Sequence, residues 1–330
     1  MKVFYIPIEP YETRYTADWI QQFEKEFHNH NLECETILGK TFSNTVTTGG
    51  VLDACGTHVY KFNQLQNLIT KINENEIRNG DIIFFADLWF PGLESLFYIR
   101  NMLKIDFKIY GIFHAGTYDS HDFTYRTGMR DWGKWLEACW FEEIDKIFIA
   151  TDFHKKLLLK NSYLVSRLAD KIYVTGLPFY GDELRKKYLS SHKENILVFP
   201  HRLDIEKHPE MFDLMCDKLR ELNIDFKPVK TIIETENRDE YFKLLGKAKV
   251  MVSFAEQETF GYSTLESMAL DNIVVVPDAL SYKETVPDGY RYNTEKECFD
   301  KVVDALLNYK IPQYDFQKWA NSIDNMIKLF

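Results

Sequence analysis

Short apolar runs alternate with longer stretches of helical period along most of the chain. Six runs rich in Ile, Val and Phe in the first half have the length of strands, and they cover 3–8, 34–38, 81–86, 108–113, 146–150 and 171–174. Between them, apolar residues recur with a helical period over 17–27, 61–75, 92–103, 132–141 and 153–160. Strands of this kind, separated by amphipathic helices, are typical of β-α-β units. The first half therefore predicts a parallel sheet.

The same pattern restarts after a polar stretch at 179–194, "FYGDELRKKYLSSHKE", which we interpret as the region where the chain crosses between domains. Strands are then predicted at 196–200, 225–229, 249–254 and 273–277, with helices at 209–222, 240–247, 262–270 and 295–308 and a last helix over 315–330. The simplest α/β architecture is two doubly wound, Rossmann-like parallel sheets facing a cleft. We expect the domains to cover 1–180 and 181–312, with 313–330 packing back on the first domain.

Length and charge narrow the classes of partner. The 330 residues suit two domains, and the net charge is −10. Residues 1–150 hold 14 basic and 21 acidic side chains, and 14 − 21 = −7 places most of the excess there. A protein that grips many phosphates is usually basic on at least one face. The acidic balance argues against a nucleic acid as the binding partner, although it does not exclude a local basic groove. It also argues against binding to anionic membranes.

Cysteine usage and hydropathy point to an intracellular protein. The five cysteines are scattered, odd in number and without a Cys-x-x-Cys pair, which is typical of reduced thiols and not of a disulfide framework or a zinc site. The first residues, MKVFYIPIEP, are too short an apolar run for a signal peptide, and no run approaches the roughly 20 apolar residues of a membrane span. We expect a soluble, cytoplasmic protein with no membrane insertion.

Two glutamates flank a glycine in "FAEQETFGYSTLESMAL". Glu258 follows a predicted strand, so it should lie beyond the strand's carboxyl end, where ligands of open α/β sheets bind. Gly261 allows a tight turn, and the helix that starts near Tyr262 offers free N–H groups to an anion such as phosphate. Glu266 lies inside this apolar helix, where it can accept hydrogen bonds from vicinal hydroxyls. The alternative is that Glu258 is an exposed charge at the helix N-terminus and Glu266 a surface residue. On this motif alone, the functional interpretation and this alternative are about equally acceptable.

A second charged stretch, "VFPHRLDIEKHPEMFDLM", runs from a predicted strand into a helix. Arg202 and Lys207 should both lie above the strand ends of the second sheet. Two cations facing a helix N-terminus would clamp a diphosphate from two sides. Alternatively, both are solvated loop charges paired with Asp204 and Glu206, and for either residue taken singly this alternative is favoured.

These stretches together resemble the retaining GT-B glycosyltransferases, the large family with the Glu-x7-Glu motif that includes sucrose and trehalose-phosphate synthases. "HRLDIEKH" resembles the family's Gly-Arg-Leu…Glu-Lys-Gly stretch, and "EQETFGYSTLESMAL" resembles its double-glutamate signature. "DNIVVVPDALSYKETVPDGYRYN" resembles the strand and Pro-Glu turn that follow, with Glu284 at the Glu position. The resemblance is good over roughly 145–292 and covers the first 110 residues only in outline.

The resemblance implies a role for each residue. Arg202 and Lys207 would hold the donor diphosphate and stabilise its charge as the glycosidic bond breaks. Glu258 would contact hydroxyls of the transferred sugar, and Glu266 would bind the nucleotide ribose. The turn and first helical residues would meet the distal phosphate; they are Phe260, Gly261, Tyr262, Ser263 and Thr264. Family members retain the configuration of the anomeric carbon and need no obligatory metal or other cofactor. In keeping with this, the sequence has no Asp-x-Asp metal-diphosphate signature.

The first domain supplies two further candidates. His114 follows a predicted strand at a position where the family often has a histidine facing the donor sugar, and a structural histidine is the alternative. The family's first strand usually leads into a Gly-Gly loop near the donor phosphate, whereas here it leads into "EPYETRYTADW". Arg14 is a candidate to replace that backbone contact. Gly49 and Gly50, further along, could belong to an acceptor loop or to an ordinary turn.

Aromatic and cationic residues alternate over 118–141, and we look for the acceptor near this stretch. The alternative is a helix that packs Trp132, Trp135 and Trp140 into the core, which we expect for at least two of them.

The sequence thus predicts an enzyme that transfers a hexosyl or pentosyl group from a nucleotide-diphosphate sugar to a hydroxyl acceptor. The acceptor is left open, and it could be a hydroxymethylated base of viral DNA or a modified tRNA. The rivals are a sugar-nucleotide epimerase, a phosphorylase and a sugar-nucleotide-binding module without activity. A dehydrogenase is set aside because no Gly-x-Gly-x-x-Gly follows the first strand.

Overall fold

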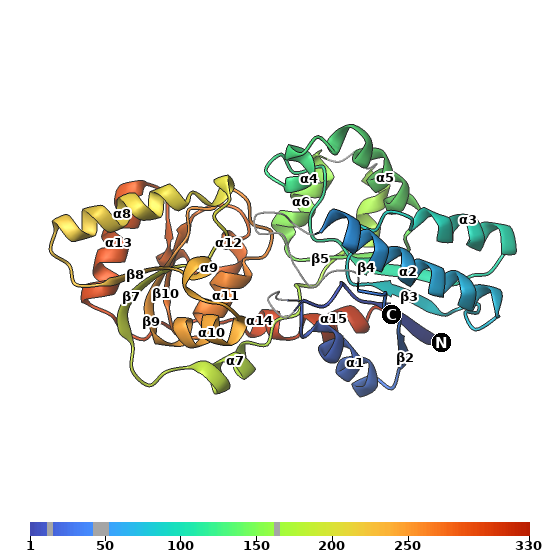
Figure 1. The fold of residues 1–330 in the computed structure, drawn as a ribbon, viewed down its shortest axis with the longest axis horizontal. Helices are drawn as coiled ribbons and strands as arrows, with labels where there is room; N and C mark the ends of the chain where they lie inside the picture. Colours follow the sequence, from blue (N-terminus) through green and yellow to red (C-terminus); the bar gives the residue numbers. More distant parts are fainter. Residues whose placement is uncertain (12–15, 42–52, 162–165) are drawn as a thin grey trace. The chain divides into compact units, whose positions relative to one another are not determined.

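The chain forms two compact units, each built around one parallel sheet (Figure 1). This computed structural model describes residues 1–11, 16–41, 53–161 and 166–330. Unit 1 consists of Met1–Leu177 together with Ser322–Phe330, and unit 2 consists of Pro178–Asn321. The predicted α/β class with two doubly wound sheets is confirmed.

The sheet of unit 1 has the order β2-β1-β3-β4-β5-β6, and every neighbouring pair is parallel. In that order its strands are Glu33–Thr36, Lys2–Ile6, Ile82–Phe85, Lys108–Ile112, Lys146–Ile149 and Ile172–Val174. The helical elements of this unit are α1 Trp19–Asn29, α2 Ala54–Asn73, α3 Glu94–Leu103, α4 Phe123–Arg126, α5 Arg130–Glu143, α6 Asp152–Asn161, the 3-10 helix η1 Ser166–Lys171 and α15 Ser322–Ile327.

Successive strand side chains point to opposite sides of the sheet, and other elements pack on both faces. On one face, residues such as Phe4 and Phe85 join apolar side chains of α2, α3 and α5 in one continuous cluster. On the other, the ring of Tyr5 lies 5.2 Å from that of Phe23 in α1. The last residue of the chain, Phe330, packs on this second face against a set of rings, namely Phe27, Phe84, Tyr110 and Phe148.

The sheet of unit 2 has the order β11-β10-β9-β7-β8 and is also parallel throughout. In that order its strands are Arg291–Tyr292, Ile273–Pro277, Ala248–Val252, Glu194–Phe199 and Lys227–Lys230. The helices are α7 Gly181–Tyr188, α8 Pro209–Glu221, α9 Thr231–Glu234, α10 Arg238–Lys247, α11 Tyr262–Ala269, α12 Tyr282–Thr285, α13 Glu295–Leu307 and α14 Gln317–Ala320, with 3-10 turns η2 Ile205–Lys207 and η3 Asp288–Tyr290. Helices α8 and α13 cover one face, and α10 and α11 lie against the other.

Three local expectations differ from the structure. The polar stretch after residue 179 contains helix α7, which is fixed by Arg185 because its guanidinium pairs with Asp271. The tail forms two short helices, α14 in unit 2 and α15 in unit 1. Helix α2 begins well before residue 61 because the Asp53 side chain accepts the Cys55 N–H at 3.1 Å and caps it.

The expectation that at least two of the tryptophans in α5 belong to the core is wrong. Trp140 is buried, whereas Trp132 is 50% exposed and Trp135 is 59% exposed. The buried residues of this helix recur at 133, 137, 140 and 141, so positions 132 and 135 fall on its other face.

Within the described residues, no helix is both long enough and apolar enough to cross a membrane.

Candidate functional site

The candidate site of unit 2 lies where β7 and β9 end, because the loops that follow these neighbouring strands are joined there. The Glu256 N–H donates to the Glu206 carbonyl at 2.9 Å, which ties the loop after β9 to η2. Parallel strands deliver their following loops to the same edge of a sheet, and ligands of open α/β sheets bind at that edge.

Lys207, Glu258 and Gly261 meet at this edge. The Lys207 side chain is buried, and its Nζ donates to the Gln257 carbonyl and lies 3.6 Å from Glu258 Oε2. The other carboxylate oxygen, Oε1, accepts the Gly261 N–H at 3.0 Å. The structure thus brings the predicted cation, the first glutamate and the glycine turn into one cluster.

Gly261 is the residue before α11, and its φ of 85° lies in the left-handed region that favours glycine. Two aromatic side chains next to it have structural partners. Phe260 is buried with its ring 5.4 Å from that of Trp319, and the Tyr262 hydroxyl donates to the Pro178 carbonyl at 2.9 Å. Thr264 is buried, whereas Ser263 is half-buried. Contacts of this turn with an anion would therefore come chiefly from backbone N–H groups.

Arg202 follows β7, as predicted, but it forms ion pairs within its own loop. Its guanidinium lies 3.1 Å from Asp204 and 3.6 Å from Glu206, and the side chain is 50% exposed. These are the two carboxylates that the alternative interpretation named. Burial lowers the pKa of His201 well below its usual value, and Lys207 and then Arg202 lower it further. Both cations therefore lower the pKa of the same buried imidazole ring.

His208 stands where the resembling family motif ends in glycine. Its φ of 53° is left-handed, a conformation that few residues other than glycine adopt readily. The ring spans two elements, since Nδ1 lies 2.7 Å from Glu210 and Nε2 lies 3.2 Å from Glu256. The hydrogen bond with Glu210 is the main cause of a raised pKa of His208. This bridge offers a physical reason why the strained backbone is tolerated.

Glu266 lies in α11 and is buried, as its apolar neighbours in the sequence suggested. Its Oε2 accepts the Tyr241 hydroxyl at 2.9 Å, and its Oε1 lies 3.4 Å from the Arg238 guanidinium. Burial raises the pKa of Glu266, while Arg238 and the Tyr241 hydrogen bond lower it. Sequence reasoning missed these two partners. They lie three positions apart on α10, and nothing in that spacing connects them with residue 266.

In unit 1, His114 lies just past β4. Its Nε2 is 2.8 Å from the Ala86 carbonyl, and its ring stacks on Trp19 with centroids 5.4 Å apart. Because a carbonyl only accepts, Nε2 carries a proton and donates it in this contact. Arg14, Gly49 and Gly50 lie outside the described residues.

A buried carboxylate in unit 1 was also missed. Glu137 of α5 accepts the Thr117 N–H at 2.6 Å and the Thr117 hydroxyl at 2.8 Å, and the Trp89 indole N–H at 3.1 Å. Burial raises the pKa of Glu137, against the effect of the Thr117 hydrogen bonds. The signal that drew attention to Glu266, an acid within an apolar helix, is also present in "WLEACWF".

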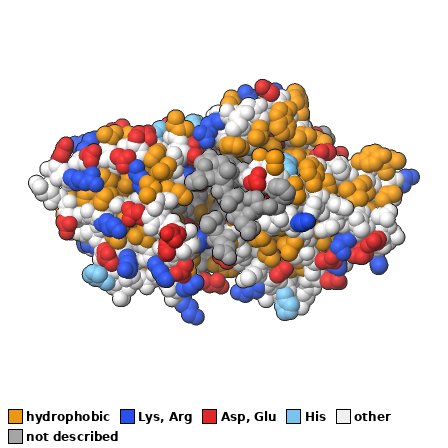
Figure 2. Space-filling view, in the orientation of Figure 1, with side chains coloured by type: hydrophobic (Ala, Val, Ile, Leu, Met, Phe, Trp, Pro, Cys, Tyr) orange, Lys and Arg blue, Asp and Glu red, His pale blue; other side chains and the backbone are white. Residues whose placement is uncertain are grey.

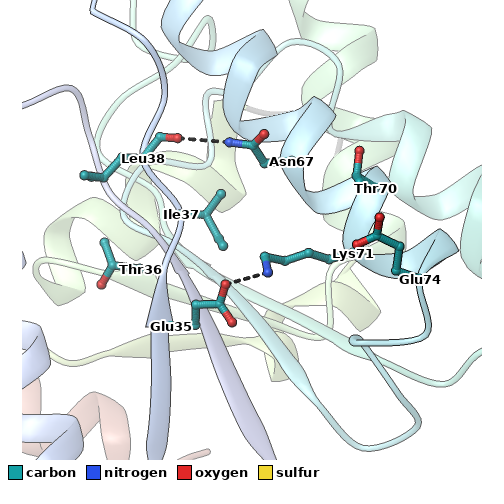
Figure 3. A pocket seen from close by; sticks show the side chains of 8 residues that line it. All are labelled: Glu35, Thr36, Ile37, Leu38, Asn67, Thr70, Lys71 and Glu74. Atoms are coloured by element: carbon teal, nitrogen blue, oxygen red, sulfur yellow. Dashed lines mark hydrogen bonds and ion pairs between the residues drawn. The ribbon is translucent and has the colours of Figure 1, made fainter.

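A shallow hollow of about 290 Å³ lies between the edge strand β2 and helix α2 (Figure 3). Lys71 Nζ lies 2.6 Å from Glu35 Oε1, and the Asn67 side chain donates to the Leu38 carbonyl at 3.3 Å. None of the predicted site residues lines this hollow. In the described part of the chain, this hollow included, no group of three or more His, Cys, Asp and Glu residues could hold a metal ion.

The sequence was compared with family models and with curated proteins. No family model matches the sequence. A curated protein of Drosophila melanogaster, tRNA-queuosine alpha-mannosyltransferase, is 28% identical over 130 residues, which cover 32% of this chain and 34% of that protein. The match thus spans about a third of the length of this curated relative.

Solved structures resemble the whole chain. Sucrose-phosphate synthase from Thermosynechococcus elongatus has a TM-score of 0.64 at 12% identity, covering 100% of this chain and 95% of its own. A trehalose-phosphate synthase from Burkholderia vietnamiensis has a TM-score of 0.61 at 10% identity, with 99% and 95% covered. Starch synthase IV from Arabidopsis thaliana, solved with ADP and acarbose, has a TM-score of 0.60 at 10% identity, with 99% and 95% covered. The chain therefore has the two-domain GT-B fold of these glycosyltransferases.

Proposed function

We propose that the chain is a glycosyltransferase that moves a hexose or pentose from a nucleotide-diphosphate sugar to a hydroxyl acceptor. The transfer would retain the configuration of the anomeric carbon and need no obligatory metal. The observation that carries the proposal is the cluster of Lys207, Glu258 and Gly261 at the start of α11, with buried Glu266 inside the same helix. The fold and the partial likeness to a curated mannosyltransferase support it.

Each residue of the cluster has a task in such a reaction. The acceptor oxygen forms a bond to the anomeric carbon as the bond between that carbon and the phosphate oxygen breaks. The departing diphosphate takes the electron pair of the broken bond and gains charge, and the proton of the acceptor hydroxyl passes to it or to water. Lys207 and Arg202 would stabilise that charge together with the backbone N–H groups that begin α11. Glu258 would accept hydrogen bonds from the sugar hydroxyls, and Glu266 would accept them from the ribose. His114 of unit 1 would hydrogen-bond a hydroxyl of the sugar or of the acceptor.

The test begins with the donor. The full chain is incubated with a panel of nucleotide sugars, and thermal stabilisation and slow hydrolysis are recorded. A ligand at about 100 times its Kd stabilises the fold by about 2.7 kcal/mol, which is readily measured. The expected products are a free nucleoside diphosphate and a sugar of retained configuration, and activity should persist in a chelator. An isomerised donor or a sugar phosphate would instead support the epimerase or the phosphorylase.

Two substitutions test the cluster itself. Lys207→Ala and Glu258→Gln should lower donor turnover by a factor on the order of 100 or more, because each removes a group proposed to act on the leaving diphosphate or the sugar. The matched control is Lys247→Ala, since Lys247 is exposed and pairs with Glu194 at the start of β7. Full turnover in either site variant, with an unchanged melting temperature, would contradict the assignment.

A further inference from the structure

Helix α4 and the first turns of α5 carry a surface that the proposed donor chemistry does not use. Trp132 is 50% exposed and Trp135 is 59% exposed. Figure 2 shows hydrophobic side chains gathered over this region, in the upper part of the view. Large aromatic side chains left this open in a folded protein often mark a binding surface. We call Tyr125, Arg130, Trp132, Lys134 and Trp135 the α4–α5 surface.

The Trp132 ring of this surface packs on partly buried neighbours. Trp132 packs against Trp89 with centroids 6.1 Å apart and an interplanar angle of 65°. Trp89 in turn donates its indole N–H to buried Glu137 at 3.1 Å. Glu137 also fixes the loop after β4 through Thr117. The exposed Trp132 ring therefore stands on a packed, hydrogen-bonded support, which reduces the entropy lost when a flat ligand stacks on it.

The charge of this surface is opposite to that of the chain. Residues 123–136 contain Arg126, Arg130 and Lys134 against Asp131 alone, so 3 − 1 gives +2 in a protein of net charge −10. The Arg130 guanidinium lies 5.0 Å from the centre of the Tyr125 ring, and Lys134 Nζ lies 5.2 Å from that of Trp135. Exposed aromatic side chains together with cations suit the bases and phosphates of a single strand. A neutral glycan would not require the cations.

The surface also lies at the functional edge of its own sheet. Helix α5 leads from the loop after β4 into β5, so its first turns lie near the carboxyl ends of the strands. That loop starts at Phe113 and contains His114. A ligand bound on the first turns of α5 is thus on the same edge of unit 1 as this histidine.

We propose that the α4–α5 surface binds unpaired nucleotides, so that the acceptor hydroxyl belongs to a nucleoside of a nucleic acid. The acceptor role rests on the proposed glycosyltransferase function, whereas the binding itself does not. The partial likeness to an enzyme named for a tRNA nucleoside agrees with it. RNA and DNA share the stacking and phosphate chemistry used here, so the experiment separates them.

The full chain is titrated into labelled single-stranded RNA and single-stranded DNA of about 12 nucleotides, the matching duplex, and vesicles with and without anionic lipid. Binding of at least one single strand is expected, weaker at about 200 mM than at about 50 mM salt. Trp132→Ala with Trp135→Ala should weaken it about tenfold or more, and Trp135→Phe should retain part of the affinity. Arg130→Gln with Lys134→Gln should also reduce the slope of affinity against salt, by about 0.7 for each phosphate that the variant no longer neutralises.

The matched control is Tyr98→Ala with Met102→Ala on α3, because these side chains are 66% and 64% exposed and lie outside the surface. It should bind the strand like the unmodified chain. The inference is overturned by absence of binding at low salt, by binding of the duplex or the vesicles alone, or by tryptophan variants that keep full affinity. Melting temperatures establish that every variant is folded.

One more variant separates this inference from the proposed function. Lys207→Ala should bind the single strand normally while donor turnover is lost. If donor turnover is present and strand binding is absent, only the α4–α5 inference fails. If strand binding depends on the tryptophans but no nucleotide sugar is turned over, the proposed function fails and the surface stands as a nucleic-acid site.

Discussion

At the scale of single residues, Glu266 is subject to opposing influences. Burial favours its protonated form and raises its pKa, while the Arg238 guanidinium at 3.4 Å and the Tyr241 hydroxyl at 2.9 Å favour the carboxylate. A ribose diol donates two hydrogen bonds, which an ionised carboxylate accepts and a protonated one accepts poorly. The usefulness of Glu266 in donor binding therefore depends on Arg238.

This dependence gives a prediction for pH. Donor affinity should fall as the pH decreases through the pKa of Glu266, because the group takes up a proton. Arg238→Ala removes a cation that lowers this pKa, so the pKa rises and the loss of affinity should move to higher pH. The measurement is the Kd of the preferred nucleotide sugar between about pH 5 and about pH 8.

The control for this prediction is Arg220→Ala, since Arg220 is an exposed arginine of unit 2 that pairs with Asp217. Its pH profile should match that of the unmodified chain. A profile of Arg238→Ala that moves to lower pH, or does not move, would show that Arg238 does not control the ionisation of Glu266.

At the scale of elements, the start of α11 depends on the backbone of one glycine. Gly261 has a φ of 85°, and its N–H donates to Glu258 at 3.0 Å. Gly261→Ala should destabilise the fold by about 1 kcal/mol because an L side chain disfavours this φ. It should also weaken donor binding, since relaxing the strain turns the N–H groups that begin the helix. Both effects are read from melting temperature and from donor Kd.

Gly289→Ala is the matched control for that substitution. Gly289 is exposed, its φ is not in the left-handed region, and an added Cβ would meet nothing within 4 Å. It should change neither stability nor donor affinity appreciably. Equal behaviour of the two alanine variants would mean that the conformation of Gly261 is not important for the site.

Elements with strong periodicity could be predicted from the sequence, and elements defined by distant partners could not. The strand of β10 is found at the predicted residues 273–277 because its apolar run is bounded by polar ones. Helix α7 was missed because its charges resemble a linker, and only the fold brings Asp271 to Arg185. In the same way, the positions of Glu258 and Lys207 after strands could be predicted from the sequence. The contacts of Arg238 and Tyr241 with Glu266 could not, because only the fold brings these residues together.

At the scale of the whole molecule, the division into two units follows from the hydrophobic pattern, because each sheet needs its own helices on both faces. The pattern also places a last helical segment at the end of the chain. The pattern cannot show which part of that segment belongs to which unit, because this depends on the aromatic rings against which each part packs. Phe316 meets Phe179 of unit 2, and Phe330 meets the aromatic face of the sheet in unit 1.

This division gives a prediction with its own control. Phe330 stacks on Phe148 and packs edge-on against Phe84 and Tyr110. Phe330→Ala should therefore destabilise unit 1 by about 2 kcal/mol, less than for a fully buried Phe because this ring is half-buried. Hydrogen exchange should quicken in β1, β3 and β4 while β7, β9 and β10 stay protected.

Phe316→Ala should produce the reverse pattern. Its ring lies 6.1 Å from that of Phe179, and an atom added at Gly181 would collide with it, so it fills a packed position in unit 2. Its loss should speed exchange in unit 2 and leave the sheet of unit 1 protected. If both variants loosened both sheets equally, the two units would unfold as one cooperative body. A difference between them would mean that each phenylalanine stabilises the unit against which it packs.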